Sequence, residues 1–218
     1  KSMKAALKAK EFAVISEIKR ASPSAGHIAD IGDPLERAKE YVSYGAAAIS
    51  VLTDAGFNGS MADLRRVTDG LKDTPVPVLC KDFMLTPPQI AEAAANGADV
   101  ILLIVHVLKE KTHEMAKIAH SFGLEVLVEV HTAAELEIAL SANADVIGVN
   151  QRDLNDFSMH PEQFADLIKL IPADKVKVAE SGIKTREQAL AAIELGYDGV
   201  LVGEALSRLD NPATFFGL

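Results

Sequence analysis

The sequence predicts a single (β/α)8 barrel, the TIM barrel, in one domain spanning residues 1–218. Short apolar, β-branched runs alternate with stretches of helical period, a pattern typical of buried parallel strands joined by helices. The alternation continues without a linker or a low-complexity break and gives eight strands. A doubly wound open sheet is the alternative. The strand number argues against it, as does the lack of a Gly-x-Gly-x-x-Gly turn in the sequence.

The predicted strands share β-branched or aliphatic cores of four to six residues, and they are residues 13–18, 47–52, 76–80, 100–105, 126–130, 146–149, 176–179 and 199–202. The predicted helices between them include residues 34–44, 87–96, 109–122, 132–142, 161–170 and 185–195. Several begin with a capping residue or an early proline, as at Asp33-Pro34. Several end in glycine or asparagine before the next strand, as at Gly45 and Asn96.

Composition narrows the class of partner. The net charge of −9 argues against nucleic acid or an anionic membrane as the main partner, but it leaves room for an anionic small molecule. We expect a monomer or a weak homodimer. Cys80 is the single cysteine of the sequence, which excludes an internal disulfide and fits a reducing compartment. With no long apolar segment and no signal sequence after the basic start, we expect a cytoplasmic protein.

Five of the apolar runs end in a charged or amide side chain where a turn residue would be usual. These side chains are Glu17, Lys81, Glu129, Asn150 and Glu180, and Lys19 follows Glu17 at the same strand end. A buried charge without a partner costs several kcal/mol. In a barrel the carboxyl ends of the strands surround one site, so the sequence predicts a polar pocket there.

The spacing of two residues places further side chains on the same face as these strand-end groups. Phe83 follows Lys81 by two residues, and Arg152 follows Asn150 by two. A crowded, dry site raises the pKa of a glutamate or lowers that of a lysine, which suits proton transfer in both directions. The alternative is a set of buried ion pairs that only hold the barrel mouth together.

A phosphate site is predicted after the last two strands. Barrels bind phosphate there through backbone amides, and the sequence places Ser181, Gly182, Gly203 and Glu204 in these turns. Ser22 in the first loop adds a hydroxyl. The alternative is that both glycines serve ordinary turns.

Two further features are assigned structural roles. Cys80 alternates with Lys81 and should point toward the helices as a small apolar residue. His113 and His120 lie seven residues apart on one predicted helix without a matching carboxylate pattern, so we expect no metal site.

With these residues in view, the chain resembles the indole-3-glycerol phosphate synthase family of tryptophan biosynthesis. The resemblance rests on motifs that occur in the family's order over almost the whole chain: Ile15-Ser-Glu-Ile-Lys-Arg-Ala-Ser-Pro-Ser24, Ser50-Val-Leu-Thr53, Asn58-Gly-Ser60, Lys81-Asp-Phe83, Gly97-Ala-Asp-Val-Ile-Leu-Leu-Ile104, Val128-Glu-Val-His131, Gly148-Val-Asn-Gln-Arg-Asp-Leu154, Glu180-Ser-Gly-Ile183 and Gly203-Glu-Ala-Leu206.

The resemblance implies a lyase that closes the ring of 1-(2-carboxyphenylamino)-1-deoxyribulose 5-phosphate, with loss of carbon dioxide and water and without a cofactor. It implies that Lys81 is the general acid for closure and that Glu129 is its partner in dehydration. Lys19 would bind the carboxylate of the substrate and is a second candidate for the acid. Glu17 would orient either lysine, and Asn150 would bind the substrate hydroxyls.

The remaining implied roles concern binding. Glu180 and Ser181 would line the pocket, Phe83 and Leu102 would pack the aromatic ring, and Arg152 would add a substrate contact. Ser22, Gly182, Gly203 and the backbone of Glu204 would hold the phosphate.

Three departures from the family pattern are expected to affect the lid and not the catalytic residues. The extension before the first strand is shortened to about a dozen residues, whereas the family usually has a longer one that folds over the barrel mouth. The loop Asp54-Ala55-Gly56-Phe57 is short and lacks the common Lys-Tyr-Phe ending. The chain also stops soon after Leu206, so we expect a short last helix.

Two alternatives to this function remain at the sequence level. Phosphoribosylanthranilate isomerase is disfavoured because that family is expected to use a cysteine and an aspartate as its acid–base pair. In this sequence no cysteine ends the first predicted strand. A catalytically weak or inactive barrel that binds a phosphorylated ligand is supported only by the short extension.

Overall fold

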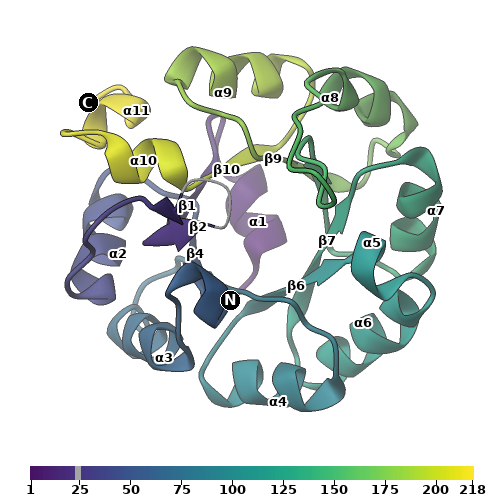
Figure 1. Cartoon of the computed structure of the whole chain (residues 1–218), viewed down its shortest axis with the longest axis horizontal. Helices are drawn as coiled ribbons and strands as arrows, with labels where there is room; N and C mark the ends of the chain where they lie inside the picture. Colours follow the sequence, from purple (N-terminus) through teal and green to yellow (C-terminus); the bar gives the residue numbers. More distant parts are fainter. Residues whose placement is uncertain (23–25) are drawn as a thin grey trace.

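The computed structural model describes residues 1–22 and 26–218, and in this part of the chain eight parallel strands close into a barrel (Figure 1). Their bounds are β1 Val14–Ile18, β4 Ala48–Leu52, β5 Val78–Lys81, β6 Val100–Ile104, β7 Glu125–Val130, β8 Val146–Asn150, β9 Val176–Glu180 and β10 Gly199–Val202. The barrel closes because β1 pairs with both β4 and β10. The predicted fold class is confirmed, and the predicted strand limits agree to within two residues.

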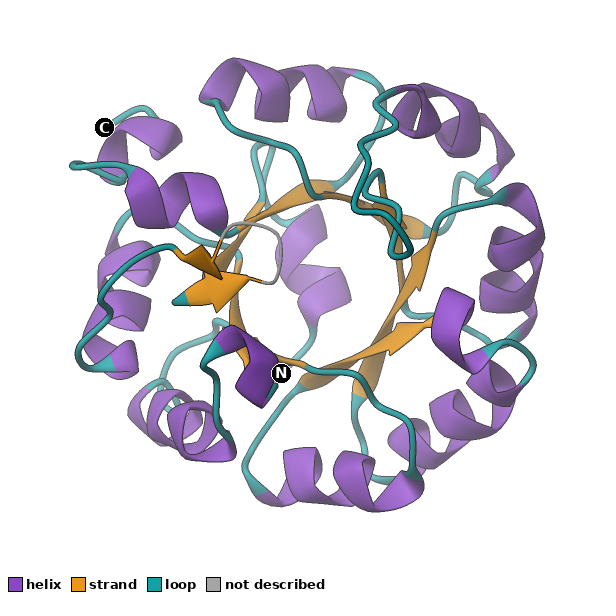
Figure 2. Ribbon diagram, viewed as in Figure 1, coloured by secondary structure: helices purple, strands orange, loops and turns teal. Residues whose placement is uncertain are grey.

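Helices surround the barrel on the outside (Figure 2). Their bounds are α2 Pro34–Ser43, α3 Met61–Gly70, α4 Pro87–Ala95, α5 Val105–Leu108, α6 Lys111–Ser121, α7 Ala133–Ser141, α8 Glu162–Leu167, α9 Arg186–Glu194, α10 Glu204–Arg208 and α11 Ala213–Phe216, with 3₁₀ turns η1 Ala55–Phe57 and η2 Ile168–Leu170. Side-chain caps fix several starts, as where the Asp33 carboxylate accepts from the Leu35 amide. No helix in the described part of the chain could cross a membrane.

The loops after β1 and β6 depart from the predicted elements. The predicted helix 109–122 corresponds to α6, which begins only at Lys111. Lys109 has a positive φ, which ends the short helix α5 and separates it from α6. A two-residue antiparallel ribbon, β2 Ala21–Ser22 with β3 Gly26–His27, stands in the loop after β1. Elements this short leave no periodic pattern, so the sequence did not predict them.

Alternate residues of each strand face two separate apolar layers. One set, which includes Val51 and Cys80, packs against the helices, and the other, which includes Ile15 and Leu79, fills the barrel interior. The prediction that Cys80 points toward the helices is confirmed. Burial raises the pKa of its thiol to about 12, so it is not a nucleophile.

The amino end of the barrel is closed by a helix that the sequence analysis did not predict, α1 Met3–Lys8. Met3 and Leu7 are fully buried and join the apolar cluster of the barrel interior. The Glu125 carboxylate, at the start of β7, accepts from the Met3 amide (2.7 Å). Figure 2 shows α1 through the barrel, behind the strands. It therefore stabilises the end of the barrel opposite the site described below.

Leu7→Ala should reduce the free energy of unfolding by about 2–5 kcal/mol, because it leaves a cavity at the closed end of the barrel. Chemical denaturation measures this effect. Lys4→Ala is the control, since it changes an exposed side chain of the same helix. A Leu7→Ala protein as stable as Lys4→Ala would contradict the role given to α1.

Candidate active site

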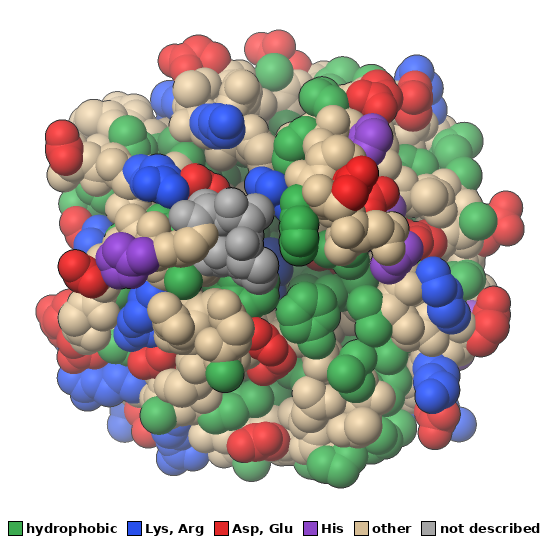
Figure 3. All heavy atoms as spheres, viewed as in Figure 1, with side chains coloured by type: hydrophobic (Ala, Val, Ile, Leu, Met, Phe, Trp, Pro, Cys, Tyr) green, Lys and Arg blue, Asp and Glu red, His purple; other side chains and the backbone are tan. Residues whose placement is uncertain are grey.

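The carboxyl ends of the strands surround a cavity of about 450 Å³. Most of the predicted site residues line it, namely Glu17, Lys19, Lys81, Phe83, Leu102, Glu129, Asn150, Arg152, Ser181 and Glu204. The face shown in Figure 3 has a hollow near its centre with apolar side chains beside it. Side chains that lie far apart in the sequence are thus brought to one pocket.

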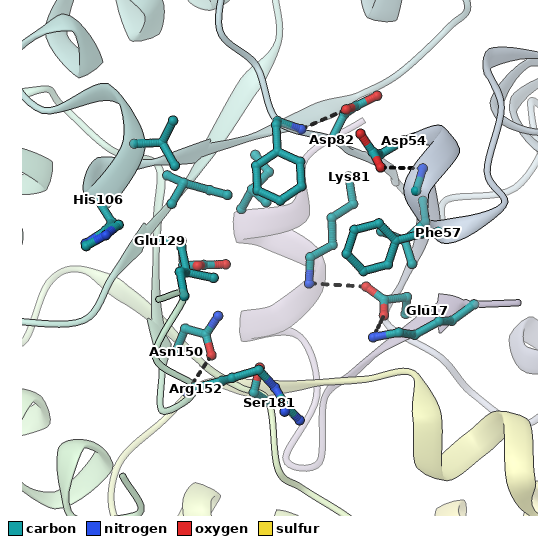
Figure 4. A pocket seen from close by; sticks show the side chains of 18 of the residues that line it. Glu17, Asp54, Phe57, Lys81, Asp82, His106, Glu129, Asn150, Arg152 and Ser181 are labelled. Atoms are coloured by element: carbon teal, nitrogen blue, oxygen red, sulfur yellow. Dashed lines mark hydrogen bonds and ion pairs between the residues drawn. The ribbon is translucent and has the colours of Figure 1, made fainter. Parts of the chain in front are cut away.

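Lys81 is the centre of the polar network (Figure 4). Its Nζ lies 3.1 Å from Glu17 Oε2 and 3.4 Å from Glu180 Oε2. Lys19 Nζ lies 3.5 Å from Glu17 Oε1, so Glu17 bridges the two lysines. Because Lys81 comes from β5, Glu17 from β1 and Glu180 from β9, the network joins strands from three parts of the barrel.

The charges of this network depend on one another. Burial disfavours the ionised form of Glu17, but Lys81 and Lys19 outweigh it and hold the pKa of Glu17 below its usual value. Burial likewise disfavours the Lys81 ammonium, and the charges of Glu17, Glu180 and Glu129 outweigh it, so the pKa of Lys81 is raised. Lys81 therefore stays a cation and Glu17 an anion near neutral pH.

Glu180 behaves differently from Glu17. Its burial raises its pKa to about 7, against the opposing charge of Lys81 and with the help of the negative charge of Glu129. A carboxyl group with this pKa can hold or release a proton near neutral pH.

Two glycines make room for these carboxylates. A Cβ at Gly148 on β8 would overlap the Glu180 carboxylate, and a Cβ at Gly203 would overlap that of Glu17. Gly203 had been assigned to phosphate binding or to an ordinary turn, and the structure adds this packing role.

The Asn150 side chain is fixed by its own loop. Its Oδ1 accepts from the Arg152 amide at 2.9 Å, and its Nδ2 points toward the cavity (Figure 4). It can therefore donate to a ligand in the pocket.

Aromatic rings form one wall of the cavity. The rings of Phe57 and Phe83 lie 6.4 Å apart, and Lys19 Nζ lies 5.7 Å from the Phe57 ring centroid. Phe57 was not among the predicted site residues, and neither were Leu154, Phe157 and His106, which also line the cavity. Each lies in the segment that follows a strand end, but residue type alone does not distinguish these side chains from packing residues.

A second cavity of about 370 Å³ adjoins the first and lies at the predicted phosphate position. Its lining includes Ser181, Gly182, Gly203 and Glu204 from the turns after β9 and β10, together with Lys19. The side chain of Ser22, the other predicted phosphate contact, lies outside the described residues.

These features define a class of protein. A (β/α)8 barrel with a buried lysine between two carboxylates, an aromatic wall and an adjoining glycine-lined cavity is suited to an acid–base enzyme acting on a small aromatic substrate.

Comparison with known proteins gives the particular family. The family model described as indole-3-glycerol phosphate synthase matches residues 1–216. An indole-3-glycerol phosphate synthase of Mycolicibacterium gilvum is 47% identical over 95% of this chain and 76% of its own length. That of Exiguobacterium sibiricum is 47% identical over 94% of this chain and 79% of its own length. The chain belongs to the indole-3-glycerol phosphate synthase family, decarboxylating lyases of tryptophan biosynthesis, which act on a phosphorylated small molecule.

Solved structures with low identity share the fold. A thiamine phosphate pyrophosphorylase from Pyrococcus furiosus superposes with a TM-score of 0.71 at 18% identity, covering 97% of this chain and 94% of its own. A mutant tryptophan synthase alpha-subunit from the same organism gives a TM-score of 0.70 at 16% identity and covers 94% of each chain.

Glu180→Gln should remove a pH dependence of stability. The folded state raises the pKa of Glu180 from 4.5 to about 7, so proton binding to Glu180 stabilises the fold. This contribution to stability is complete below pH 4.5 and is lost as pH rises through about 7. Relative to wild type, the variant should gain roughly 3 kcal/mol of unfolding free energy across this window.

Urea denaturation at a series of pH values measures this difference. The exposed Glu137→Gln on α7 is the control and should stay parallel to wild type. A constant difference between Glu180→Gln and wild type would contradict the raised pKa.

Proposed function

We propose that this pocket closes the indole ring of 1-(2-carboxyphenylamino)-1-deoxyribulose 5-phosphate, with Lys81 as the general acid. The aromatic carbon that carries the carboxylate attacks the ketone, and Lys81 donates a proton to the ketone oxygen. Loss of carbon dioxide restores the ring. The new hydroxyl then leaves as water, and Glu129 takes part in the proton transfers of this second step.

The observation that carries the assignment is the position of Lys81 Nζ between Glu17 and Glu180. Two carboxylates fix the ammonium group in one place and keep it charged, so a proton donor is present before substrate binds. The rings of Phe57 and Phe83 form a surface for the substrate ring beside it.

Lys19 is proposed to bind the substrate carboxylate. Its Nζ shares Glu17 with Lys81 and lies at the junction of the two cavities. It remains a second candidate for the acid, since the same carboxylate orients both lysines. Asn150 would donate to the substrate hydroxyls through Nδ2, and Arg152 would add a further contact.

The phosphate is proposed to occupy the second cavity, held by the backbone of Gly182, Gly203 and Glu204 and by the Ser181 and Ser22 hydroxyls. Backbone amides after the last two strands of a barrel suit an anion, and Lys19 adds a positive charge. Glu17, Lys19 and Lys81 line both cavities, so a phosphate in this position lies next to the acid–base groups.

We propose further that residues 1–218 act as one domain, as a monomer or a weak homodimer in the cytoplasm, without cofactor, nucleic acid or membrane. The net charge of −9 supports the absence of polyanionic partners.

Lys81→Ala should lower the rate of indole-3-glycerol phosphate formation by at least about 10³-fold, because the acid for ring closure is lost. A fluorescence assay of the product with purified protein measures this. Circular dichroism and inorganic phosphate binding should show that the fold and second cavity remain. Lys117→Ala, an exposed lysine of α6, is the control.

Undiminished turnover in Lys81→Ala would contradict the assignment of the acid. No product from the unaltered protein would instead favour a barrel that binds the ligand without turning it over.

A further inference from the structure

A cluster of ionisable side chains lies behind Glu129 and has no role in the proposed chemistry. His131 follows Glu129 by two residues on the same side of the chain, and Glu135 on α7 packs against it. His131 and Glu135 are each more than nine-tenths buried. His106 on α5 completes the cluster and reaches the cavity wall beside Glu129 (Figure 4).

The imidazole of His131 lies between two carboxylates. Its Nε2 is 3.5 Å from Glu129 Oε1, and its Nδ1 is 3.3 Å from Glu135 Oε2. Within the described residues, Glu129 Oε1 and His131 Nε2 are buried and make no hydrogen bond. A slight closing of their 3.5 Å separation would therefore pair them.

The ring is held firmly in this orientation. Glu135 Oε2 also accepts from the His131 backbone amide at 2.7 Å, so one carboxylate oxygen fixes both the main chain and the ring. The His131 carbonyl accepts from Gln163 Nε2 on α8 at 3.0 Å. The other oxygen, Glu135 Oε1, contacts His106 Nδ1 at 3.2 Å.

The surroundings favour the doubly protonated ring. A neutral imidazole donates from one nitrogen only, whereas the imidazolium donates from both and suits two carboxylate partners. The groups that face His131 are Glu129 from β7, Glu135 from α7, His106 from α5 and, at longer range, Glu180 from β9. Burial opposes the charge, but Glu135, Glu129 and Glu180 outweigh it and raise the pKa of His131.

We propose that His131 is a positioning residue for the reaction: held by Glu135, its imidazolium pairs with the Glu129 carboxylate and keeps that carboxylate directed into the cavity. This inference rests on the proposed role of Glu129 in proton transfer. A cation fixed behind the Glu129 carboxylate stabilises its negative charge in a dry pocket, also when Glu180 is charged.

The test is the pH dependence of kcat/KM in His131→Gln, with His120→Gln as the matched control. His120 is also paired with a carboxylate, Asp145 at 2.8 Å, but on the outside of the barrel. In His131→Gln we expect kcat to fall on the order of ten-fold with little change in KM. The acidic limb of the profile should move to higher pH, because the positive charge behind the Glu129 carboxylate is lost.

A profile for His131→Gln that superimposes on that of wild type would overturn the inference, even if the protein were less stable, because a purely structural role leaves the limb in place. Glu129→Gln separates this result from a failure of the proposed function. Full activity in Glu129→Gln would reject the role of Glu129, whereas an inactive Glu129→Gln with an unmoved His131→Gln profile would reject only the role of His131.

A second measurement does not depend on turnover. In protein with ¹⁵N-labelled histidine, the His131 ring should keep imidazolium shifts above pH 6.5, the ordinary pKa of an imidazole. Glu135→Gln should bring the His131 transition down toward the ordinary range near pH 6.5. A His131 ring that is neutral at pH 7 in the unaltered protein would contradict the proposal.

Discussion

The ion pair network around Lys81 is the interaction on which the site depends. Its ammonium group lies between the carboxylates of Glu17 and Glu180. Each of these three charged groups would be costly to bury alone. Together the three charges stabilise one another. Glycine is required at positions 148 and 203 because a larger residue there would displace one of the two carboxylates. The network also explains why charged residues end strands that are otherwise apolar.

The same network sets the strength of Lys81 as an acid. Two anionic neighbours keep it protonated but also make it slow to give up its proton. Glu180, with a pKa of about 7, can relieve this constraint, because protonation of Glu180 removes one of the two anions. Loss of that charge lowers the pKa of Lys81 and makes it a stronger acid, so the proton affinities of the two groups are linked.

Much of the fold and the floor of the site could be predicted from the sequence, because both follow from strand periodicity. The eight strands were placed from their β-branched runs, and a charge at a strand end then located Glu17, Lys81, Glu129 and Glu180. Features without such periodicity were missed. Helix α1 is one, since its burial depends on the barrel interior that it closes.

Several site residues outside the strands could not be predicted from the sequence for the same reason. Phe57 lies on a 3₁₀ turn whose place over the pocket is fixed by tertiary contacts with Phe83 and Lys19. His131 was noticed only as part of a motif, and its position between two carboxylates required the packing of α7 on β7. The two-residue ribbon β2–β3 is too short for any sequence pattern.

The charge state of Lys81 tests the central claim most directly. In protein with ¹⁵N-labelled lysine, we expect the Lys81 ammonium signal to persist above about pH 10.4, the ordinary pKa of a lysine side chain. In a Glu17→Gln, Glu180→Gln double variant, burial without these two carboxylates should bring the transition of Lys81 below about pH 10.4. A Lys81 that titrates at or below about pH 10.4 in the unaltered protein would contradict the account.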